Sequence, residues 1–483
     1  MASQTSQKIR VAVVGGGLAG LAAGCALTEA GFFVSLFERR PYLGGRASSY
    51  QHPGTGEVVD NCQHVLLGCC TNLVDLYRRT GVEDKIRWYD RLVFLEPGGR
   101  QSWIGPSFLP APWHNTPSFL GAACLGFADK VSIARAMIAL LRRAPADDGK
   151  PFLGWLESHH ATRAAVERFW KAILISALNE DLERVSVSYA ALVIRESFMK
   201  SAEAGRMGVP AIPLSELYRA AGDYIEARGG DIRLRSTVEG VRWDGAGVRV
   251  LAGGVETQAD YLVLTAPFDA TARLLPEGSE TAALRGQLGR FSTSPIVGIH
   301  FWFDRQITQL DHAVLLDRTI QWMFHKSKLQ ENPHPSKERL GGAPGLSGVS
   351  VSSTGSYVEL VVSAAKALVG KSKNEIEDLA LAECREFFPG AREAQLVKST
   401  VIKEVHATFS PEPGGDAYRP VQTTAWPRVF LAGDWTATGW PATMEGAVRS
   451  GYLAAEAVTK GAGAAREFLV PDLPATGVMR LFD

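Results

Sequence analysis

Three glycines near the N-terminus have the spacing of a pyrophosphate-binding turn. Gly15, Gly17 and Gly20 follow directly on the small, apolar run 11–14, which is typical of a strand buried on both faces. The first glycine permits a tight turn, the second lets a pyrophosphate approach the backbone, and the third lets the next helix pack close to the strand. The spacing therefore predicts a dinucleotide site at the carboxyl end of this strand.

The elements around this turn must position it. Leu18 and Ala19 open a helix that we expect to stop at Gly31, and the free N–H groups and positive dipole end at its start favour phosphate. A strand over 32–37 follows and ends at Glu38, at about the 20-residue spacing at which an acidic residue binds the ribose hydroxyls. This order indicates a Rossmann-like unit, but it does not separate NAD from FAD.

A second set of chemically capable side chains comes soon afterwards. Asp60, Asn61, Gln63 and His64 bring a carboxylate, two amides and an imidazole into one short segment. His64 titrates near neutrality, which makes it a candidate proton donor or substrate contact beside the cofactor. We predict these four residues as catalytic. The alternative is that they bond to the loop backbone and position the cofactor. His300 lies on an apolar strand, and we expect it to be structural.

Composition excludes several classes of function. The chain has 483 residues, which favours two domains over one core. Lysine plus arginine equals aspartate plus glutamate, at 51 each, so no global basic character points to nucleic acid. The six cysteines form no CxxC pair, and adjacent Cys69 and Cys70 suit neither zinc nor an easy disulfide. We therefore predict no metal and a reducing, cytoplasmic setting. The polar segment 1–10 does not look like a secretory signal.

The pattern of apolar segments predicts an α/β protein with a discontinuous cofactor domain. That domain would be assembled from residues 1–94, 214–270 and 394–460. The two insertions would build an α+β substrate domain, from residues 95–213 and 271–393. The tail 461–483 begins rich in glycine and alanine, and we expect it to be loosely held.

A membrane-contacting region is a further expectation. The stretch 101–128 carries no charged side chain, yet Pro106, Pro110 and Pro112 break any spanning helix. The next stretch, 129–143, has the period of an amphipathic helix with basic edges. Two interpretations of 101–143 have equal support. One is an ordinary packing helix. The other is an interfacial contact that would make the protein peripheral on the inner face of the cytoplasmic membrane.

Two further segments resemble motifs of one flavoprotein superfamily, that of the amine oxidases and phytoene desaturases. The segment 39–46 resembles its second phosphate-contacting loop, and Gly433-Asp434 resembles its other FAD motif. The segment 443–447 is similar to the amine-oxidase end motif. The resemblance implies a Rossmann-like FAD-binding domain of amine-oxidase type. It also implies cofactor contacts at Arg39, Gly45, Arg46, Val238, Gly433, Asp434, Met444, Glu445 and Ala447.

The segment 59–68 narrows the resemblance. It reads VDNCQHVLLG and resembles the DNGQHVLLG signature of the hydroxysqualene dehydroxylases, also called squalene-associated FAD-dependent desaturases. Cys62 departs from the signature, which has glycine there. Similar segments elsewhere extend the resemblance over nearly the whole chain. It implies reductive dehydroxylation of hydroxysqualene to squalene in hopanoid synthesis, in which an allylic cation left by the protonated hydroxyl takes a hydride from reduced FAD.

This resemblance also implies partners. The substrate would be a hydrophobic C30 isoprenoid, and the enzyme would be coupled in function to squalene-forming prenyltransferases. NADPH is a candidate external reductant, although no second G-x-G-x-x-G marks a site for it, and a separate reductase is the alternative. A long hydrocarbon requires an apolar tunnel, which we expect from 101–128, 299–303 and 321–324. Asn179 is a candidate contact for the substrate hydroxyl.

Three other functions stay open. A phytoene-type desaturase would use the same fold in the oxidative direction. A flavin amine oxidase is disfavoured because 294–300 lacks the lysine with which many relatives hold a water at the flavin. A prenyl-protein escort, which shares the fold without flavin, is disfavoured by the retained Glu38, Arg46 and Gly433-Asp434.

Overall fold

The computed structural model describes residues 8–142, 149–329 and 355–482. A five-stranded parallel sheet in the order β10-β2-β1-β14-β20 organises one half of the molecule. Its strands come from both ends and the middle of the chain: β1 (Arg10–Val14), β2 (Phe33–Phe37), β10 (Asp231–Arg233), β14 (Tyr261–Leu264) and β20 (Val429–Leu431). The central strands are almost wholly apolar and buried, as a parallel sheet covered on both faces requires. The predicted Rossmann-like sheet is thus confirmed.

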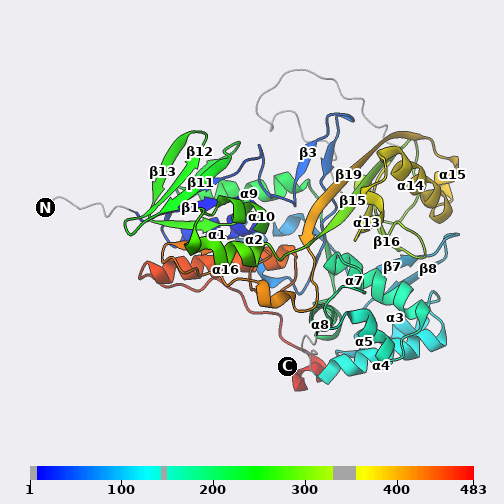
Figure 1. The fold of residues 1–483 in the computed structure, drawn as a ribbon. Coiled ribbons are helices and arrows are strands. Elements are labelled where there is room, and N and C mark those ends of the chain that lie inside the picture. The colour runs from blue at the N-terminus through cyan, green and yellow to red at the C-terminus, as the bar shows by residue number, and fades with distance from the viewer. Residues whose placement is uncertain (1–7, 143–148, 330–354, 483) are drawn as a thin grey trace.

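Helices from opposite ends of the sequence cover this sheet side by side (Figure 1). Helix α1 (Leu18–Glu29) packs against α16 (Met444–Gly461) and against α9 (Leu214–Ala227). The approach of α1 and α16 is close because Gly451 carries no side chain. A Cβ there would lie 2.3 Å from the Ala19 carbonyl oxygen. The N-termini of both helices point toward the carboxyl edge of the sheet, where the predicted cofactor residues gather.

A small antiparallel sheet lies beside the parallel one. It consists of β11 (Val238–Trp243), β12 (Val248–Ala252) and β13 (Val255–Ala259). The chain then returns to the parallel sheet as β14 and continues into α10 (Phe268–Leu274) and α11 (Ser279–Leu288). Two minor sheets brace the segment that carries the predicted catalytic residues. They pair β3 (Ser49–Gln51) with β4 (Val58–Asp60), and β9 (Met207–Pro210) with β5 (Leu66–Leu67) and β6 (Ile86–Tyr89). Helix α2 (Thr71–Thr80) follows β5.

The other half is built on a seven-stranded mixed sheet of order β19-β15-β18-β17-β16-β7-β8. Its members are β7 (Leu92–Leu95), β8 (Gln101–Ile104), β15 (Thr293–Phe303), β16 (His312–Leu315), β17 (Trp322–Phe324), β18 (Ser356–Ser363) and β19 (Leu396–Phe409). Helices α12 (Lys326–Leu329), α13 (Lys366–Val369), α14 (Lys373–Phe387) and α15 (Gly390–Glu393) accompany it. Strand β19 falls inside the segment 394–460 that we assigned to the cofactor domain, yet it pairs along its length with β15.

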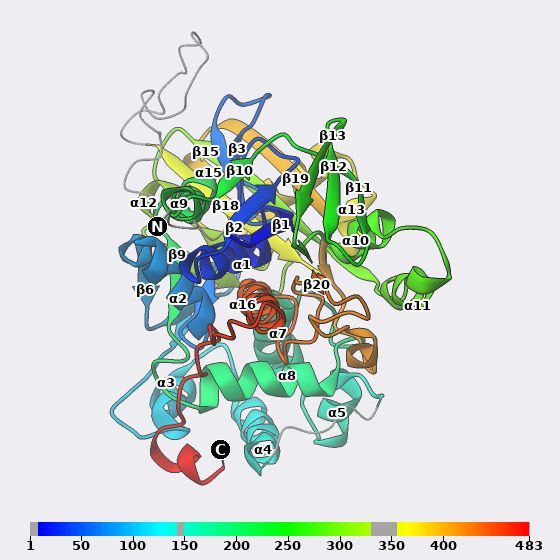
Figure 2. The ribbon, with the colours of Figure 1, turned by 90° about the vertical axis from the view of Figure 1, so that its left-hand side faces the viewer.

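A helical layer closes the molecule below this sheet (Figure 2). It contains α3 (Thr116–Gly121), α4 (Phe127–Arg142), α5 (Phe152–Ser158), α6 (Arg163–Ala165), α7 (Lys171–Leu178) and α8 (Val187–Ile194). Two π-helical turns, η3 (Val166–Trp170) and η4 (Arg195–Met199), interrupt the pattern. Such turns are rare and often lie at functional sites. None of the helices among the described residues is long and apolar enough to cross a bilayer.

The C-terminal tail is not loosely held, contrary to the prediction. It runs from α16 to the helical layer and ends beside α4 in both views (Figures 1 and 2). The Val478 amide donates to the Ala111 carbonyl at 3.0 Å. Phe468 and Met479 are buried. The prediction rested on the glycine- and alanine-rich start of the tail and did not consider these apolar residues, which follow it and hold it to the protein.

Candidate functional site

One cavity of about 1090 Å³ joins the two halves of the molecule. Nearly all predicted cofactor residues line it: Gly15, Gly17, Leu18, Ala19, Glu38, Arg39, Gly45, Arg46, Val238, Gly433, Asp434, Met444, Glu445 and Ala447. Gly20 does not, because it packs under the turn, where a Cβ would meet the Gly15 carbonyl oxygen at 1.9 Å. That packing is the role predicted for the third glycine.

The glycine turn offers backbone to a ligand at close range. Gly15 has a φ of +120°, and a Cβ there would lie 2.7 Å from the Thr265 hydroxyl oxygen. Gly17 and Gly45 lie against each other, since a Cβ on Gly45 would be 3.0 Å from the Gly17 Cα. Helix α1 starts at Leu18 with no side-chain cap and no acidic residue in its first turn. The first N–H groups therefore remain available to an anion, which fits a dinucleotide pyrophosphate.

Glu38 lies at the end of β2, where the ribose is expected. One carboxylate oxygen accepts the Gly16 amide at 2.7 Å and the other accepts the Arg40 amide at 2.8 Å. These bonds fix a buried carboxylate beside the glycine turn. A carboxylate oxygen has further lone pairs, so Glu38 can still accept ribose hydroxyls.

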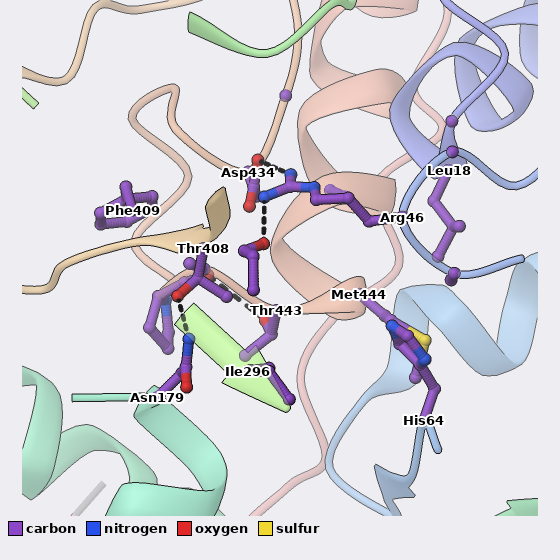
Figure 3. A pocket seen from close by; sticks show the side chains of 18 of the residues that line it. Leu18, Arg46, His64, Asn179, Ile296, Thr408, Phe409, Asp434, Thr443 and Met444 are labelled. Carbon is purple, nitrogen blue, oxygen red and sulfur yellow. Dashed lines mark hydrogen bonds and ion pairs between the residues drawn. The ribbon is translucent and has the colours of Figure 1, made fainter. Parts of the chain in front are cut away.

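Arg46 and Asp434 connect the first and last parts of the cofactor site. The Arg46 guanidinium donates to the Asp434 carboxylate at 2.7 Å and to the Ala407 carbonyl at 2.7 Å (Figure 3). Burial works to lower the pKa of Arg46, but the Asp434 carboxylate outweighs it and the pKa rises. The guanidinium is therefore a permanent cation on the cavity wall, suited to a pyrophosphate.

Glu445 lines the cavity, yet its carboxylate serves the fold. It is fully buried and accepts the amides of Asn72 at 3.2 Å and Leu73 at 2.8 Å, at the start of α2. The bonds satisfy orphan N–H groups in the first turn of that helix. Burial raises the pKa of Glu445. We infer that this residue contributes backbone, rather than charge, to the cofactor wall.

Of the four predicted catalytic residues, three line the cavity and one lies behind it. Asn61, Gln63 and His64 belong to the lining, whereas Asp60 does not. The Asn61 amide donates to the Arg46 carbonyl at 3.2 Å and to Glu404 at 2.9 Å. The side-chain amide of Gln63 donates to the His64 carbonyl at 3.0 Å. These bonds hold the segment in place, which is the positioning role we weighed as the alternative.

His64 is the member whose ring remains available. Its Nδ1 lies 2.7 Å from the Cys62 carbonyl oxygen, and because a carbonyl only accepts, Nδ1 carries the proton in the neutral ring. Burial lowers the pKa of His64. Nε2 then has a lone pair and no hydrogen bond to any residue that the structure describes. Figure 3 shows the ring on the wall of the cavity near Met444.

Asn179 lies on the wall but has its polar atoms engaged. Its Nδ2 donates to the Ser294 carbonyl and to the Thr408 hydroxyl, both at 2.9 Å, while Oδ1 accepts the Ala364 amide at 2.7 Å. It also ends α7 with a φ of 52°. The residue therefore ties α7 to the sheet, which disfavours it as a ligand for a substrate hydroxyl. His300 is buried, and desolvation lowers its pKa to about 3, which agrees with the structural role we expected.

Sequence reasoning missed two charged groups below the loop and one beside the C-terminal motif. Lys326 and Glu359 are both buried and lie under residues 60–63. Arg419 donates to the Asp434 and Thr436 carbonyls at 2.9 and 2.5 Å and so shapes the turn after Gly433. Only the burial of these charges marks them, and no local pattern in the sequence signals it.

Away from these polar groups, the cavity becomes an apolar branch lined by strands of the sheets and by helices of the helical layer. It is lined by Leu66, Leu67, Leu92, Phe94, Ile173, Leu192, Val193, Phe198, Met207, Ile296, Val314, Trp322 and Phe324. Trp322 and Phe324 stack with centroids 5.4 Å apart, and the Trp322 N–H donates to Ser176 at 2.5 Å. The predicted segments 299–303 and 101–128 contribute no residue to this lining; β15 reaches it through Ile296 instead.

The cavity thus joins a dinucleotide cradle to an apolar chamber, and comparisons with known proteins agree with that combination. The chain is 27% identical to a 15-cis-phytoene desaturase of Synechococcus elongatus over 93% of its own length and 96% of that protein. It is also 27% identical to a zeta-carotene desaturase of Synechocystis, over 93% of this chain and 97% of the relative.

Solved structures share the fold at lower identity. An oxidoreductase of Methanosarcina mazei superposes with a TM-score of 0.69 at 18% identity, covering 92% of this chain and 99% of that one. Cyclohexylamine oxidase of Brevibacterium oxydans gives 0.64 at 18% identity, covering 95% and 100%. The sequence profile of the flavin-containing amine oxidoreductases matches residues 18–459. The chain belongs to that family and is a flavin-dependent oxidoreductase whose cofactor is FAD.

Proposed function

We propose that the protein removes the allylic hydroxyl of hydroxysqualene reductively and releases squalene. The observation that carries this proposal is the course of the loop 60–67. Its polar end bonds to the backbone of Arg46 in the cofactor cradle, and its apolar end, Leu66 and Leu67, enters the hydrocarbon chamber. His64 lies between these ends with one ring nitrogen available. A polar ring nitrogen at the entrance of an apolar chamber fits a substrate that is hydrocarbon except for one hydroxyl.

The reaction replaces the hydroxyl group on one carbon of the substrate by a hydrogen. The carbon–oxygen bond breaks, the hydroxyl takes one proton and leaves as water, and the carbon receives a hydride. Reduced FAD, when bound, supplies that hydride. Nε2 of neutral His64 can accept the substrate hydroxyl and so orient it. Because burial lowers the pKa of His64, its protonated form is a stronger acid than ordinary histidine and can donate to the leaving oxygen.

The apolar branch supports the choice of a long isoprenoid. Its side chains offer no charge to the chain of the substrate, except near Glu196, which is ion-paired with Lys200 at 3.0 Å. The stacked Trp322 and Phe324 faces can stabilise a developing allylic cation. Exclusion of water from such a chamber keeps the cation from being hydrated.

A carotenoid-type desaturase is the second candidate, and two observations favour it. The relatives reported above are named as desaturases. The unprotonated Nε2 of His64 could also accept a proton as hydride leaves a substrate carbon. An amine oxidase has less support. Ile296 stands on the cavity wall of β15, and no lysine occurs among the described residues that line the cavity.

Anaerobic flavin spectroscopy separates the two candidates. Enzyme with photoreduced FAD is mixed with hydroxysqualene in detergent, and oxidised enzyme is mixed with squalene or phytoene. We expect return of the oxidised-flavin absorbance with one squalene formed per flavin in the first mixture, and no bleaching in the second. Bleaching only in the second mixture would exclude dehydroxylation and establish the desaturase.

We further propose that a lipid surface delivers the substrate. Large apolar side chains stand exposed on neighbouring elements of the helical layer and the tail: Phe108, Trp113, Leu120, Phe127, Ile138 and Leu481. Lys130 lies among them, with its ammonium bonded to the Leu120 carbonyl. Such a face with a basic edge suits an interfacial contact with anionic lipid. It would make the protein peripheral on the cytoplasmic face of the membrane, close to squalene-forming prenyltransferases.

Co-sedimentation with phosphatidylglycerol-containing liposomes tests this surface. We expect the wild type to pellet with the vesicles and the Phe108→Asp/Phe127→Asp variant to stay in the supernatant. Val397→Asp is the matched control, because Val397 is 62% exposed on β19 in the other half of the molecule. Equal sedimentation of all three proteins would refute a lipid-facing role. The source of electrons is tested separately, by whether NADPH alone reduces the bound flavin.

A further inference from the structure

Three ionisable side chains from distant segments meet beneath the loop that carries His64. Nζ of Lys326, at the start of α12, lies 2.5 Å from the Asp60 carboxylate, 2.7 Å from Oε1 of Gln63 and 3.7 Å from the Glu359 carboxylate. Oε1 of Glu359, on β18, accepts a hydrogen bond from the backbone N–H of Gln63 at 2.5 Å. All three ionisable side chains are almost completely buried, and none lines the cavity.

The charges balance only if one carboxyl group holds a proton. Burial raises the pKa of Glu359 to about 8, so this group is neutral near pH 7. Burial also works to raise the pKa of Asp60, but the Lys326 ammonium outweighs it and the pKa falls. The network therefore contains one cation and one anion. This arrangement is compatible with burial, since an unpaired buried charge costs several kcal/mol.

Contacts of the network converge on one short piece of backbone. Lys326 binds the Asp60 carboxylate at one end of it and the side chain of Gln63 at the other. Glu359 binds the backbone N–H of Gln63. The sheet lies directly beneath, because a Cβ on Gly298 would be 3.5 Å from the Asn61 carbonyl oxygen. The residue that follows Gln63 is His64, whose ring is aimed by its bond to the Cys62 carbonyl. The backbone on both sides of that carbonyl is thus fixed by Lys326.

We propose that Lys326 is a positioning residue, which holds the 60–64 loop through Asp60 and Gln63 and thereby sets the orientation and protonation of His64. It does not contact substrate or cofactor in this role. The activity part of its test rests on the proposed function, whereas the titration part does not. The charged groups that face His64 are Asp60, Lys326 and Arg46.

The test compares Lys326→Met with Lys326→Arg and Glu359→Gln. Methionine preserves the apolar stem but removes every donor to the loop; arginine keeps the charge and the donors. Glutamine replaces a carboxyl group that is already neutral near pH 7 and keeps the acceptor for the Gln63 amide, which makes it the matched control. Gln63→Leu is a second variant, which keeps Lys326 and its bond to Asp60 but removes the side-chain bonds of Gln63 to Lys326 and to the His64 carbonyl. It serves if Lys326→Met does not fold.

Two readouts distinguish positioning from a general structural role. The ¹³Cε1 resonance of labelled His64 is titrated by NMR, with His64→Ala for assignment, and FAD affinity is measured by fluorescence quenching. In Lys326→Met we expect the His64 titration to move by at least half a pH unit and kcat to fall at least tenfold, while the Kd for FAD changes less than threefold. Lys326→Arg should restore most of both, and Glu359→Gln should match the wild type at pH 7.

The result that overturns the proposal is a wild-type His64 titration in both Lys326→Met and Gln63→Leu. A parallel loss of FAD binding and folding in both variants, with no separate change at His64, would also overturn it and assign the network to the core alone. If hydroxysqualene is not turned over at all, the proposed function fails, but the His64 titration still decides the role of Lys326.

Discussion

Replacing Arg46 by methionine tests how the first and last parts of the chain share the cofactor. Arg46 donates to Asp434 and Ala407 and also lines the cavity. A hydrogen bond to a charged group contributes about 1.5–3 kcal/mol. Loss of one such bond to the pyrophosphate therefore predicts a Kd for FAD that rises roughly 10- to 150-fold.

The same change affects the protein without cofactor. The Asp434 side chain is only 7% exposed and would lose its cation, whereas the Arg46 side chain is 34% exposed and partly hydrated. The cost therefore falls between that of an exposed pair, about 0–1 kcal/mol, and that of breaking a buried pair, about 3–5 kcal/mol. We expect the apoprotein to lose roughly 1–3 kcal/mol of unfolding free energy in urea.

Fluorescence quenching of FAD titrated with apoprotein measures the first effect. Arg46→Lys should fall between wild type and Arg46→Met, because it keeps the charge but loses the forked geometry. Arg273→Met is the control. Arg273 also lines the cavity, but its side chain is 71% exposed and pairs with Asp269 on the same helix. If Arg46→Met binds FAD within threefold of wild type, the pyrophosphate does not lie at Arg46 and our account of the cradle is wrong.

Three further predictions concern packing, pH and the buried network. Gly451→Ala should lower the unfolding free energy by about 2–4 kcal/mol, since its Cβ would press on α1, whereas Gly286→Ala, which meets open space on α11, should be neutral or stabilising in the same urea melts. If protonated His64 is the acid, kcat for dehydroxylation should rise as pH falls toward the lowered pKa of His64, and a desaturase using His64 as base should show the opposite slope. A flat profile in pre-steady-state rates would exclude both roles. Glu359 has a folded pKa of about 8 against 4.5 unfolded, so the native state holds the extra proton and stability falls as pH rises through that window. Glu359→Gln should abolish this loss, which is at most about 5 kcal/mol, and a wild-type pH dependence of its melts would contradict the assignment.

The sequence motifs predicted the Rossmann-like half of the fold well, because each motif depends on residues that are close together in the chain. The turn from Gly15 to Gly20 needs only a strand before it and a helix after it, and Glu38 follows at a fixed distance along the same unit. The seven-stranded sheet was harder. The end of β19, at Ala407 and Thr408, lines the cavity beside the cofactor, yet the strand pairs with β15 along its length. The predicted boundary at residue 394 therefore assigned a strand of the seven-stranded sheet to the cofactor domain.

The segment 60–64 shows a different limit of prediction from sequence. Three of the four residues predicted as catalytic line the cavity, but four polar side chains in one short segment look alike in sequence. Their roles separate only through partners far along the chain, because Asp60 faces Lys326 whereas His64 faces the cavity. Asn179 likewise looks available until Ser294, Thr408 and Ala364 are seen to use its amide. No spacing rule predicts such tertiary hydrogen bonds.

The ion pair between Arg46 and Asp434 has a consequence for biosynthesis. Its partners are 388 positions apart, so at about 5–20 residues per second a ribosome makes the second roughly 20–80 s after the first. During that interval β1, β2 and α1 exist without β20 and α16, and the apolar faces that those elements later cover remain open. A nascent chain in this state has only the N-terminal part of the FAD site and an uncovered edge of the parallel sheet. We therefore expect flavin capture to be a late, post-translational event, and the emerging N-terminal half to depend on chaperones that shield hydrophobic surface.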